Sequence, residues 1–412
     1  MSEGTVMMTK PEEVGFSAPR LDRIRVHLQR YIDAGKVSGT LTLVARHGQI
    51  AYFEPQGHLE LERVRPMQRD TIFRIYSMTK PIASVALMML YEHGLFQLDD
   101  PVHKFIPAWQ HLRVYVSGNH PLFITKPTER PMTIRDLLTH TSGLTYGFME
   151  RTNVDAAYRK LGIANTAARG YTLQDMVEQL TALPLEFSPG TRWNYSVSTD
   201  VVGYLVEVIS GQSFDAYLHD HIFAPLGMSD TSFLISDDQL SRFAHCYGLR
   251  PDGNLALLDA PETSEYRQGS FWSGGGGLVS TAHDYYRFTS MLLNRGELDG
   301  VRLLSRKTLE LMTQNHLPGA QDLTALAQAG MFTEVAYNGV GFGLGFSVMQ
   351  DPTRAQVVGT PGEYAWGGLA STAFWVDPVE DLIVIFMTQL VPSSAYPVRR
   401  ELRTLTYSAL MD

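Results

Sequence analysis

The segments that favour β-strand lie near the two ends of this chain, with a long helical stretch between them. Two runs rich in β-branched and aromatic residues, 41–46 and 50–53, follow an amphipathic helix predicted over 18–34. Three more strand candidates come near the other end, at 341–348, 370–376 and 382–387. Since 80–227 is predicted to be mostly helical, we expect one antiparallel sheet built from both ends of the chain and flanked by the terminal helices, an α/β (α+β) fold.

Two lobes are expected, because 412 residues exceed the usual size of one hydrophobic core. We predict a discontinuous α/β lobe formed by residues 1–76 and 281–412, which ends in a helix over about 398–410. Residues 77–280 are predicted to form a mostly helical lobe. Clefts between lobes favour small molecules, so we expect the active site where the lobes meet.

Charge and composition limit the classes of partner. The chain has 34 Lys and Arg against 43 Asp and Glu, a net charge of -9, and its basic residues are scattered, so no nucleic-acid partner is expected. The start of the chain does not resemble a secretory signal, and no apolar run is long enough to span a membrane, so we expect a cytoplasmic protein with no membrane partner. The lone Cys246 and the scattered histidines show no metal-ligand spacing, so neither a metal nor a cofactor is predicted. The sequence gives no indication of the oligomeric state.

Ser77 and Lys80 stand three residues apart where a helix is predicted to begin. Pro81 is tolerated only in the first turn of a helix, and the apolar run 82–91 predicts a buried helix, so Ser77 lies at or near the helix N-terminus. A hydroxyl and an amine at this spacing share one helical face and can share a hydrogen bond. An N-cap serine followed by a solvated lysine is the alternative interpretation of these two residues.

Three further segments carry polar or glycine-rich patterns. Thr133 is predicted to cap a short helix that ends in the sequence His-Thr-Ser-Gly-Leu at 140–144. Tyr195 lies in a loop just before a predicted helix, from which a side chain can reach a neighbouring site. The glycine run at 274–277 is not followed by a lysine in phosphate-binding spacing, so it is interpreted as a place of close backbone packing.

Taken together, these segments resemble the serine β-lactamase and penicillin-binding-protein superfamily. The matching positions are Ser77, Lys80, the segment 133–144, Tyr195 and the segment 277–281. They follow the family's order and cover about residues 10–410. The branch with a catalytic tyrosine holds the class C β-lactamases and their relatives, among them the family VIII carboxylesterases and the statin-type acyltransferases. The resemblance implies a β-lactamase/penicillin-binding-protein-like fold.

Two departures from the class C pattern bear on the substrate. Class C enzymes carry Tyr-x-Asn, but here Val197 stands two positions after Tyr195, so the amide that would contact a β-lactam side chain is absent. In place of Lys-Thr-Gly the chain has Trp366, Gly367 and Gly368, which resembles the family VIII esterases. An indole in place of a cation removes the group that would bind a substrate carboxylate, and this favours neutral esters.

The resemblance implies a role for each matched residue. Ser77 would attack an ester carbonyl and form an acyl-enzyme. Lys80 and Tyr195 would act as the base, with the group that takes the serine proton left open. Tyr195 would then return a proton to the leaving alcohol and help to activate water for deacylation. The backbone N–H groups of Ser77 and Leu369 would form the oxyanion hole.

Several residues near these segments are predicted to bind substrate. They are Trp366, Gly367, Gly368, Trp193 and Tyr364. The two glycines would let substrate approach the strand closely, whereas each aromatic residue also fits a place in the hydrophobic core. His140 is interpreted as a structural histidine, because no Ser-His-Asp triad is needed where a lysine and a tyrosine supply the base.

The sequence therefore predicts a serine carboxylesterase that hydrolyses short to medium acyl esters, with a small-molecule ester as its partner. One alternative is a β-lactamase or D-amino peptidase/amidase of the same fold, and another is an acyltransferase that uses an alcohol acceptor. A non-catalytic binding protein with the same fold is a third. No Gly-x-Ser-x-Gly pentapeptide occurs, which argues against an α/β-hydrolase esterase.

Overall fold

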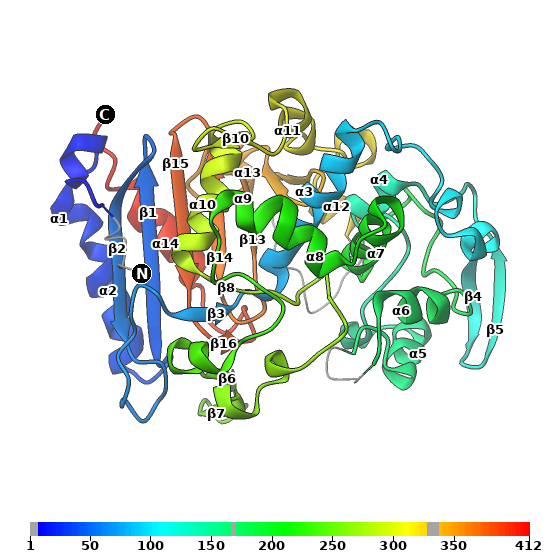
Figure 1. The fold of residues 1–412 in the computed structure, drawn as a ribbon, viewed down its shortest axis with the longest axis horizontal. Helices are drawn as coiled ribbons and strands as arrows, with labels where there is room; N and C mark the ends of the chain where they lie inside the picture. The colour runs from blue at the N-terminus through cyan, green and yellow to red at the C-terminus, as the bar shows by residue number, and fades with distance from the viewer. Residues whose placement is uncertain (1–6, 166–169, 328–337) are drawn as a thin grey trace.

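A seven-stranded antiparallel sheet combines strands from both ends of the chain (Figure 1). The computed structural model describes residues 7–165, 170–327 and 338–412. In spatial order the strands are β11 (Val340–Phe342), β12 (Ser347–Met349), β13 (Tyr364–Gly367), β14 (Ala373–Asp377), β15 (Leu382–Met387), β1 (Gly39–Arg46) and β2 (Gln49–Gly57). The N-terminal β1 pairs with the C-terminal β15, so that Leu41 lies opposite Met387. The predicted α+β architecture is confirmed.

Helices cover both faces of this sheet and form most of the region beside it (Figure 1). They are α1 (Ala18–Leu21), α2 (Arg23–Asp33), α3 (Thr79–Glu92), α4 (Ile134–Leu138), α5 (Asn153–Leu161), α6 (Leu173–Leu180), α7 (Ser198–Ser210), α8 (Phe214–Leu218), α9 (Ala224–Leu226), α10 (Ala282–Leu293), α11 (Arg306–Met312), α12 (Leu323–Leu326), α13 (Pro352–Ala355) and α14 (Val398–Tyr407). The predicted N-terminal helix is confirmed, with a break at Asp22 between α1 and α2.

The two faces of the sheet serve two hydrophobic cores. Val44 of β1 points into a core that it shares with α2 and α14. Its neighbour Leu43 points into the larger core, which also contains side chains from α3 and α10. Because neighbouring side chains of a strand point to opposite faces, every residue of β1 and β15 is buried. Side chains of α3 and α10 therefore share the core on one face of the sheet, and those of α14 pack into the core on the other.

The shorter strands form two-stranded sheets and one three-stranded sheet. They are β3 (Ile72–Arg74) with β8 (Val279–Thr281), β4 (Arg113–Asn119) with β5 (Leu122–Pro127), β6 (Cys246–Leu249) with β7 (Leu255–Asp259) and β16 (Leu390–Val391), and β9 (Glu297–Leu298) with β10 (Val301–Arg302). The pair β3–β8 joins the two places where the chain passes between the sheet and the helical region. The lobe boundaries at 76/77 and 280/281 stay a prediction from the sequence.

Two strand predictions were wrong. The single strand predicted over 341–348 is two antiparallel strands, β11 and β12, because Gly345 has a φ of +94° that reverses the chain. The hairpin β4–β5 lies within a stretch predicted to be mostly helical. Only Val114 of its residues is buried, so the hairpin carries little of the hydrophobic alternation by which a strand is recognised.

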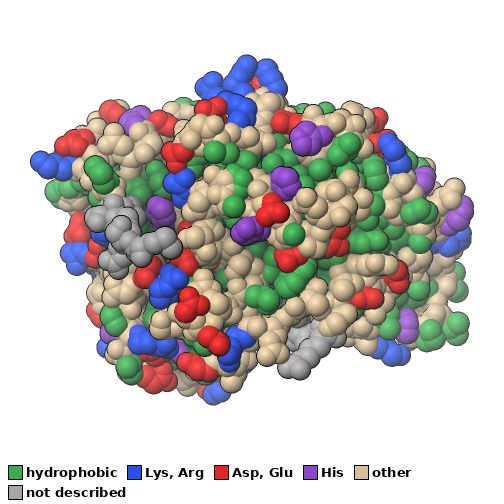
Figure 2. Space-filling view, in the orientation of Figure 1, with side chains coloured by type: hydrophobic (Ala, Val, Ile, Leu, Met, Phe, Trp, Pro, Cys, Tyr) green, Lys and Arg blue, Asp and Glu red, His purple; other side chains and the backbone are tan. Residues whose placement is uncertain are grey.

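On the face shown in Figure 2, basic and acidic side chains are interspersed. In the part of the chain that the structure describes, no helix is long and apolar enough to cross a membrane. The same ranges contain no group of three or more His, Cys, Asp or Glu placed to hold a metal ion.

Candidate active site

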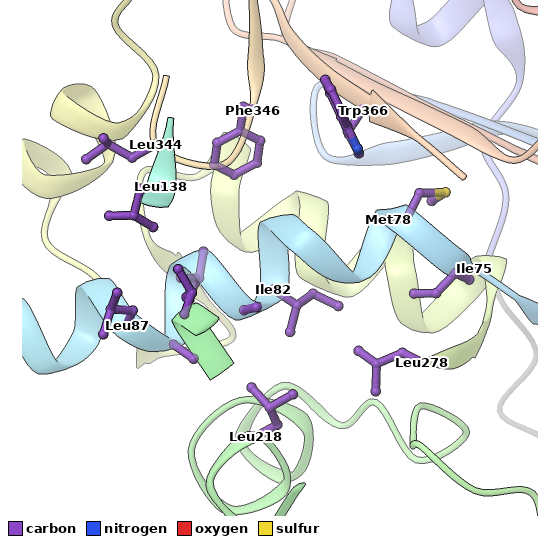
Figure 3. Close-up of a cluster of buried hydrophobic side chains, with 14 of the residues drawn as sticks. Ile75, Met78, Ile82, Leu87, Leu138, Leu218, Leu278, Leu344, Phe346 and Trp366 are labelled. Atoms are coloured by element: carbon purple, nitrogen blue, oxygen red, sulfur yellow. The ribbon is translucent and has the colours of Figure 1, made fainter. Parts of the chain in front are cut away.

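Ser77 lies just before α3, in the 3₁₀ turn Tyr76–Met78. The preceding residue, Tyr76, has a φ of 43°, a conformation that residues with side chains rarely adopt. Packing and hydrogen bonds fix this turn: Met78 is buried in the cluster of Figure 3, and its carbonyl accepts a hydrogen bond from the Tyr285 hydroxyl at 2.9 Å. The turn therefore presents the Ser77 side chain in a fixed position at the start of a buried helix.

The Ser77 hydroxyl lies between an amine and a phenol. Tyr195 donates a hydrogen bond from its hydroxyl to Ser77 Oγ at 2.6 Å, and Lys80 Nζ donates to the same oxygen at 3.4 Å. Lys80 is 2% exposed, and its Nζ also donates to the Gly275 carbonyl at 2.6 Å and to the Tyr146 hydroxyl at 3.0 Å. The structure thus brings together the serine, lysine and tyrosine that the sequence singled out.

A buried carboxyl group, Asp200, holds the backbone that contacts Lys80. Its Oδ1 accepts hydrogen bonds from the Ser273 hydroxyl and from the Gly275 N–H, the latter at 3.0 Å. Burial raises the pKa of Asp200, and the Lys80 charge together with these hydrogen bonds offsets part of that rise. Since Gly275 donates to Asp200 and accepts from Lys80, one backbone segment links the two ionisable groups.

Tyr146 is a site residue that the sequence analysis missed. It is buried, and burial raises the pKa of its hydroxyl well above the usual value, with Asp200 and Tyr195 adding to the rise. Tyr146 is therefore a neutral phenol that accepts a hydrogen bond from Lys80. Its ring stacks on Phe148 with centroids 4.6 Å apart. The sequence places it two residues after the 140–144 segment, but local spacing does not show which side chain it meets.

His140 packs against the site without contacting Ser77. Its ring lies 5.1 Å from that of Tyr195, and its Nδ1 is 3.3 Å from the Ser196 hydroxyl. Burial, reinforced by the Lys80 charge, lowers the pKa of His140 well below its usual range. A neutral, buried imidazole agrees with its interpretation as a structural histidine.

A cavity of about 410 Å³ opens beside Ser77. Its walls are largely aromatic and aliphatic, with Phe148 and Ile163 on the side of the helical region and Leu369 on the side of the sheet. Leu369 lies in the turn between β13 and β14. Among the described residues, no protein acceptor takes a hydrogen bond from the backbone N–H of Ser77 or of Leu369. Both groups are therefore available to an oxygen of a bound molecule.

The three aromatic residues predicted to line the substrate pocket lie in the core instead. Trp366 and Trp193 are buried behind Tyr195, with ring centroids 5.6 and 6.2 Å from its ring. Tyr364 packs on Phe346 at 5.3 Å. Figure 3 shows Trp366 within the buried cluster beside α3, because its position on β13 faces the larger core. All three thus lie in the hydrophobic core, which was the alternative to a place in the substrate pocket.

The two glycines after Trp366 are surrounded by protein. A Cβ atom on Gly367 would lie 2.6 Å from Arg399 Cζ, and one on Gly368 would lie 2.4 Å from the Ile75 carbonyl oxygen. From the sequence we expect these glycines to let substrate approach the strand closely. In the structure their missing side chains instead let a guanidinium and the segment before Ser77 pack against the backbone.

Comparison with known proteins identifies the family. A family model described as Beta-lactamase matches residues 24–408 of the chain. The chain belongs to the β-lactamase family. Esterase EstB of Burkholderia gladioli is 31% identical over 387 residues, 90% of each chain. An uncharacterized protein of Mycobacterium tuberculosis is 35% identical over 377 residues, again 90% of each chain.

A solved structure of this β-lactamase-family fold also matches closely. EstCE1, a hydrolase with promiscuous acyltransferase activity, superposes with a TM-score of 0.78 at 25% sequence identity. The match covers 94% of this chain and 99% of EstCE1. The predicted β-lactamase/penicillin-binding-protein-like fold and the resemblance to the esterase branch of the superfamily are confirmed.

Proposed function

We propose that the protein is a serine carboxylesterase that hydrolyses short to medium acyl esters through an acyl-enzyme on Ser77. The observation that carries this proposal is the hydrogen-bonded set of Ser77, Lys80 and Tyr195, of which Ser77 and Tyr195 line a largely apolar cavity. A nucleophile within reach of a base, beside a space that fits a small molecule, is the arrangement that covalent catalysis needs. The similarity to EstB and EstCE1 supports the same reaction class.

In the proposed acylation step Ser77 Oγ attacks the ester carbonyl and transfers its proton to the Lys80–Tyr195 pair. Tyr195 is the nearer group, at 2.6 Å, and Lys80 Nζ lies 4.4 Å from the centre of its ring. A lysine ammonium at this place would stabilise a phenolate, and a phenolate so close to Ser77 would accept the serine proton. A neutral Lys80 accepting the proton directly remains the alternative.

The developing negative charge on the carbonyl oxygen would be met by the N–H groups of Ser77 and Leu369, which border the same cavity. Tyr195 would then return the proton to the leaving alcohol. In deacylation the same hydroxyl would orient and activate a water molecule that attacks the acyl carbon. One acid–base group can serve both half-reactions because the second retraces the first with water in place of the alcohol.

The charges around the cavity favour neutral esters over substrates that carry a carboxylate. Glu150 and Glu265 border the cavity. Among its described lining residues the one cation is Arg159, which is paired with Asp155 at 2.8 Å. Val197, at the position of the class C asparagine, is fully buried in the core. A β-lactam or peptide carboxylate would thus meet acidic groups where it needs a free cation.

A substrate comparison tests the proposal. We expect p-nitrophenyl butyrate to be hydrolysed with a kcat/KM at least about 100-fold above that for a cephalosporin or a D-alanyl peptide, since the carboxylates of the latter two lack a cationic partner in the cavity. Initial rates measured with each substrate well below its KM give this ratio. Equal or faster turnover of the cephalosporin would instead show a β-lactamase.

Acyl transfer to an alcohol is a second candidate, favoured by the activity named for EstCE1 and by a cavity of about 410 Å³, which exceeds the volume of a short acyl chain. It needs only that an acceptor alcohol outcompete water at the acyl-enzyme. Adding a series of alcohols and measuring the ratio of transfer product to free acid separates the two. A new ester that dominates at low alcohol concentration would establish the transferase.

Replacing Tyr146 with phenylalanine removes one hydrogen-bond acceptor from Lys80 and leaves the ring stacked on Phe148. A hydrogen bond to a charged group contributes about 1.5 kcal/mol, so we expect kcat for ester hydrolysis to fall about tenfold with little change in KM. Steady-state kinetics on p-nitrophenyl butyrate measure both constants. An unchanged kcat would show that Tyr146 does not help to hold Lys80 in place.

A further inference from the structure

We infer that Arg399 is a positioning residue for the oxyanion hole, because it fixes the peptide unit that presents the Leu369 N–H to the cavity. This inference rests on the proposed function, since it requires an oxyanion to form at Ser77. Arg399 belongs to α14, which packs on the face of the sheet opposite α3, and it is absent from the cavity wall. It reaches the site through the backbone carbonyls that it bonds.

The guanidinium of Arg399 clamps the turn between β13 and β14. Its Nη2 donates one hydrogen bond to the Gly368 carbonyl and another to the Thr372 carbonyl, each at 2.7 Å. The turn closes on itself through the Gly368 N–H, which donates to the Thr372 carbonyl at 2.9 Å. Leu369 lies inside this closed turn. Hydrogen bonds from a charged donor are roughly twice as strong as neutral ones, so the clamp is firm.

The Gly368 carbonyl and the Leu369 N–H belong to the same peptide unit. In a planar trans peptide the C=O and N–H bonds point in opposite directions. A carbonyl held by Arg399 on the α14 side of the turn therefore directs the Leu369 N–H away from α14, toward the cavity that Leu369 shares with Ser77. The guanidinium charge of Arg399 next to this carbonyl also polarises the peptide unit and makes its N–H a stronger donor to an oxyanion.

The packing around the turn leaves it little freedom to shift. The guanidinium lies where a side chain on Gly367 would be, and Gly368 packs against the carbonyl of Ile75, two residues before Ser77. The segment that leads into Ser77 thus lies directly against the turn that carries Leu369. A tilt of the Gly368–Leu369 peptide would change the distance between the two N–H groups, and oxyanion stabilisation depends on that distance.

Substitutions on α14 provide a test with a matched control. We expect Arg399→Met to lower kcat for ester hydrolysis by about 10-fold to 100-fold, somewhat less than the 10²–10³ lost when an oxyanion donor is removed outright. KM should stay within about twofold, because the lost interaction acts in the transition state. Arg399→Lys, which keeps a cationic donor, should lose less. Arg400→Met is the control, because Arg400 Nη2 bonds the distant Gln356 carbonyl at 2.7 Å.

A second readout separates positioning from a structural role. Ser77 Oγ adds to the carbonyl carbon of a trifluoromethyl ketone. The carbonyl oxygen becomes an oxyanion, and the serine proton passes to the Lys80–Tyr195 pair. The affinity for this ketone should fall in Arg399→Met by the same factor as kcat/KM, with active sites counted by fluorophosphonate titration. If Arg399→Met does not fold, Arg399→Lys takes its place. In a separate experiment, methylguanidinium should restore part of the kcat of a folded Arg399→Ala protein. It should not raise the kcat of Arg400→Ala.

The outcomes are distinct. The inference is overturned if Arg399→Met keeps the wild-type kcat and ketone affinity per titrated site. It is also overturned if Arg400→Met loses as much kcat as Arg399→Met. Either result would leave the esterase proposal intact. If the wild-type protein neither hydrolyses esters nor labels at Ser77, the proposed function fails and the inference falls with it.

Discussion

Ester hydrolysis by a Ser77→Ala protein is expected to fall by about 10⁴-fold or more in kcat, close to the uncatalysed rate, because the substitution removes the atom that forms the acyl-enzyme. Steady-state kinetics with p-nitrophenyl butyrate measure the loss. Thermal unfolding should be little changed, since the change removes one small polar atom at the cavity wall. Retained activity in a folded Ser77→Ala protein would contradict the account.

The helix that follows Ser77 provides a matched control. Ser84 lies in the same α3 segment and is 1% exposed, but its side chain faces the turn at Gly345 rather than the cavity. Ser84→Ala also removes one buried hydroxyl from this helix. We expect this variant to keep wild-type kcat. A comparable loss in both variants would indicate damage to α3 rather than loss of a nucleophile.

The second large effect is expected for Tyr195→Phe. General acid–base catalysis contributes about 10²–10⁴-fold, so we expect kcat to fall by about 10³-fold when the hydroxyl at 2.6 Å from Ser77 is removed. The ring should keep its contacts with Trp366 and His140, and stability should change little. The same kinetic assay, combined with thermal unfolding, measures both effects.

Tyr364→Phe is the control for Tyr195→Phe. Both tyrosines are buried aromatic residues near β13, but the structure places Tyr364 in the core against Phe346. Tyr364→Phe should therefore retain wild-type kcat and KM. A changed KM would show that Tyr364 contacts the substrate. The rate of fluorophosphonate labelling assigns the base. A wild-type labelling rate in Tyr195→Phe would show that Lys80 accepts the serine proton.

Local sequence patterns were sufficient to predict most of the elements that carry the site. Ser77 and Lys80 are three residues apart, and a short-range spacing of this kind is preserved when the chain folds. The apolar run after Pro81 predicted α3, and the β-rich runs at both ends predicted β1 and β15. These signals depend on propensity and periodicity within a few residues, which tertiary packing did not override.

Contacts between distant residues could not be predicted in the same way. Tyr146 meets Lys80 across 66 residues of sequence, so nothing in its own neighbourhood shows that it belongs to the site. Arg399 and Gly368 are 31 residues apart and lie on different elements. Trp366 was assigned to the pocket because it resembles a family position. The face of β13 that it occupies is set by pairing with β12 and β14.

The most direct test of an activated serine is the mass of the intact protein after brief exposure to an aryl fluorophosphonate. The account predicts a single adduct, mapped to the peptide that contains Ser77, with no adduct on Ser77→Ala and slow labelling of Lys80→Ala. A folded protein that gains no adduct would contradict the account and favour a binding protein that has kept the β-lactamase fold. An adduct on a residue other than Ser77 would also contradict it.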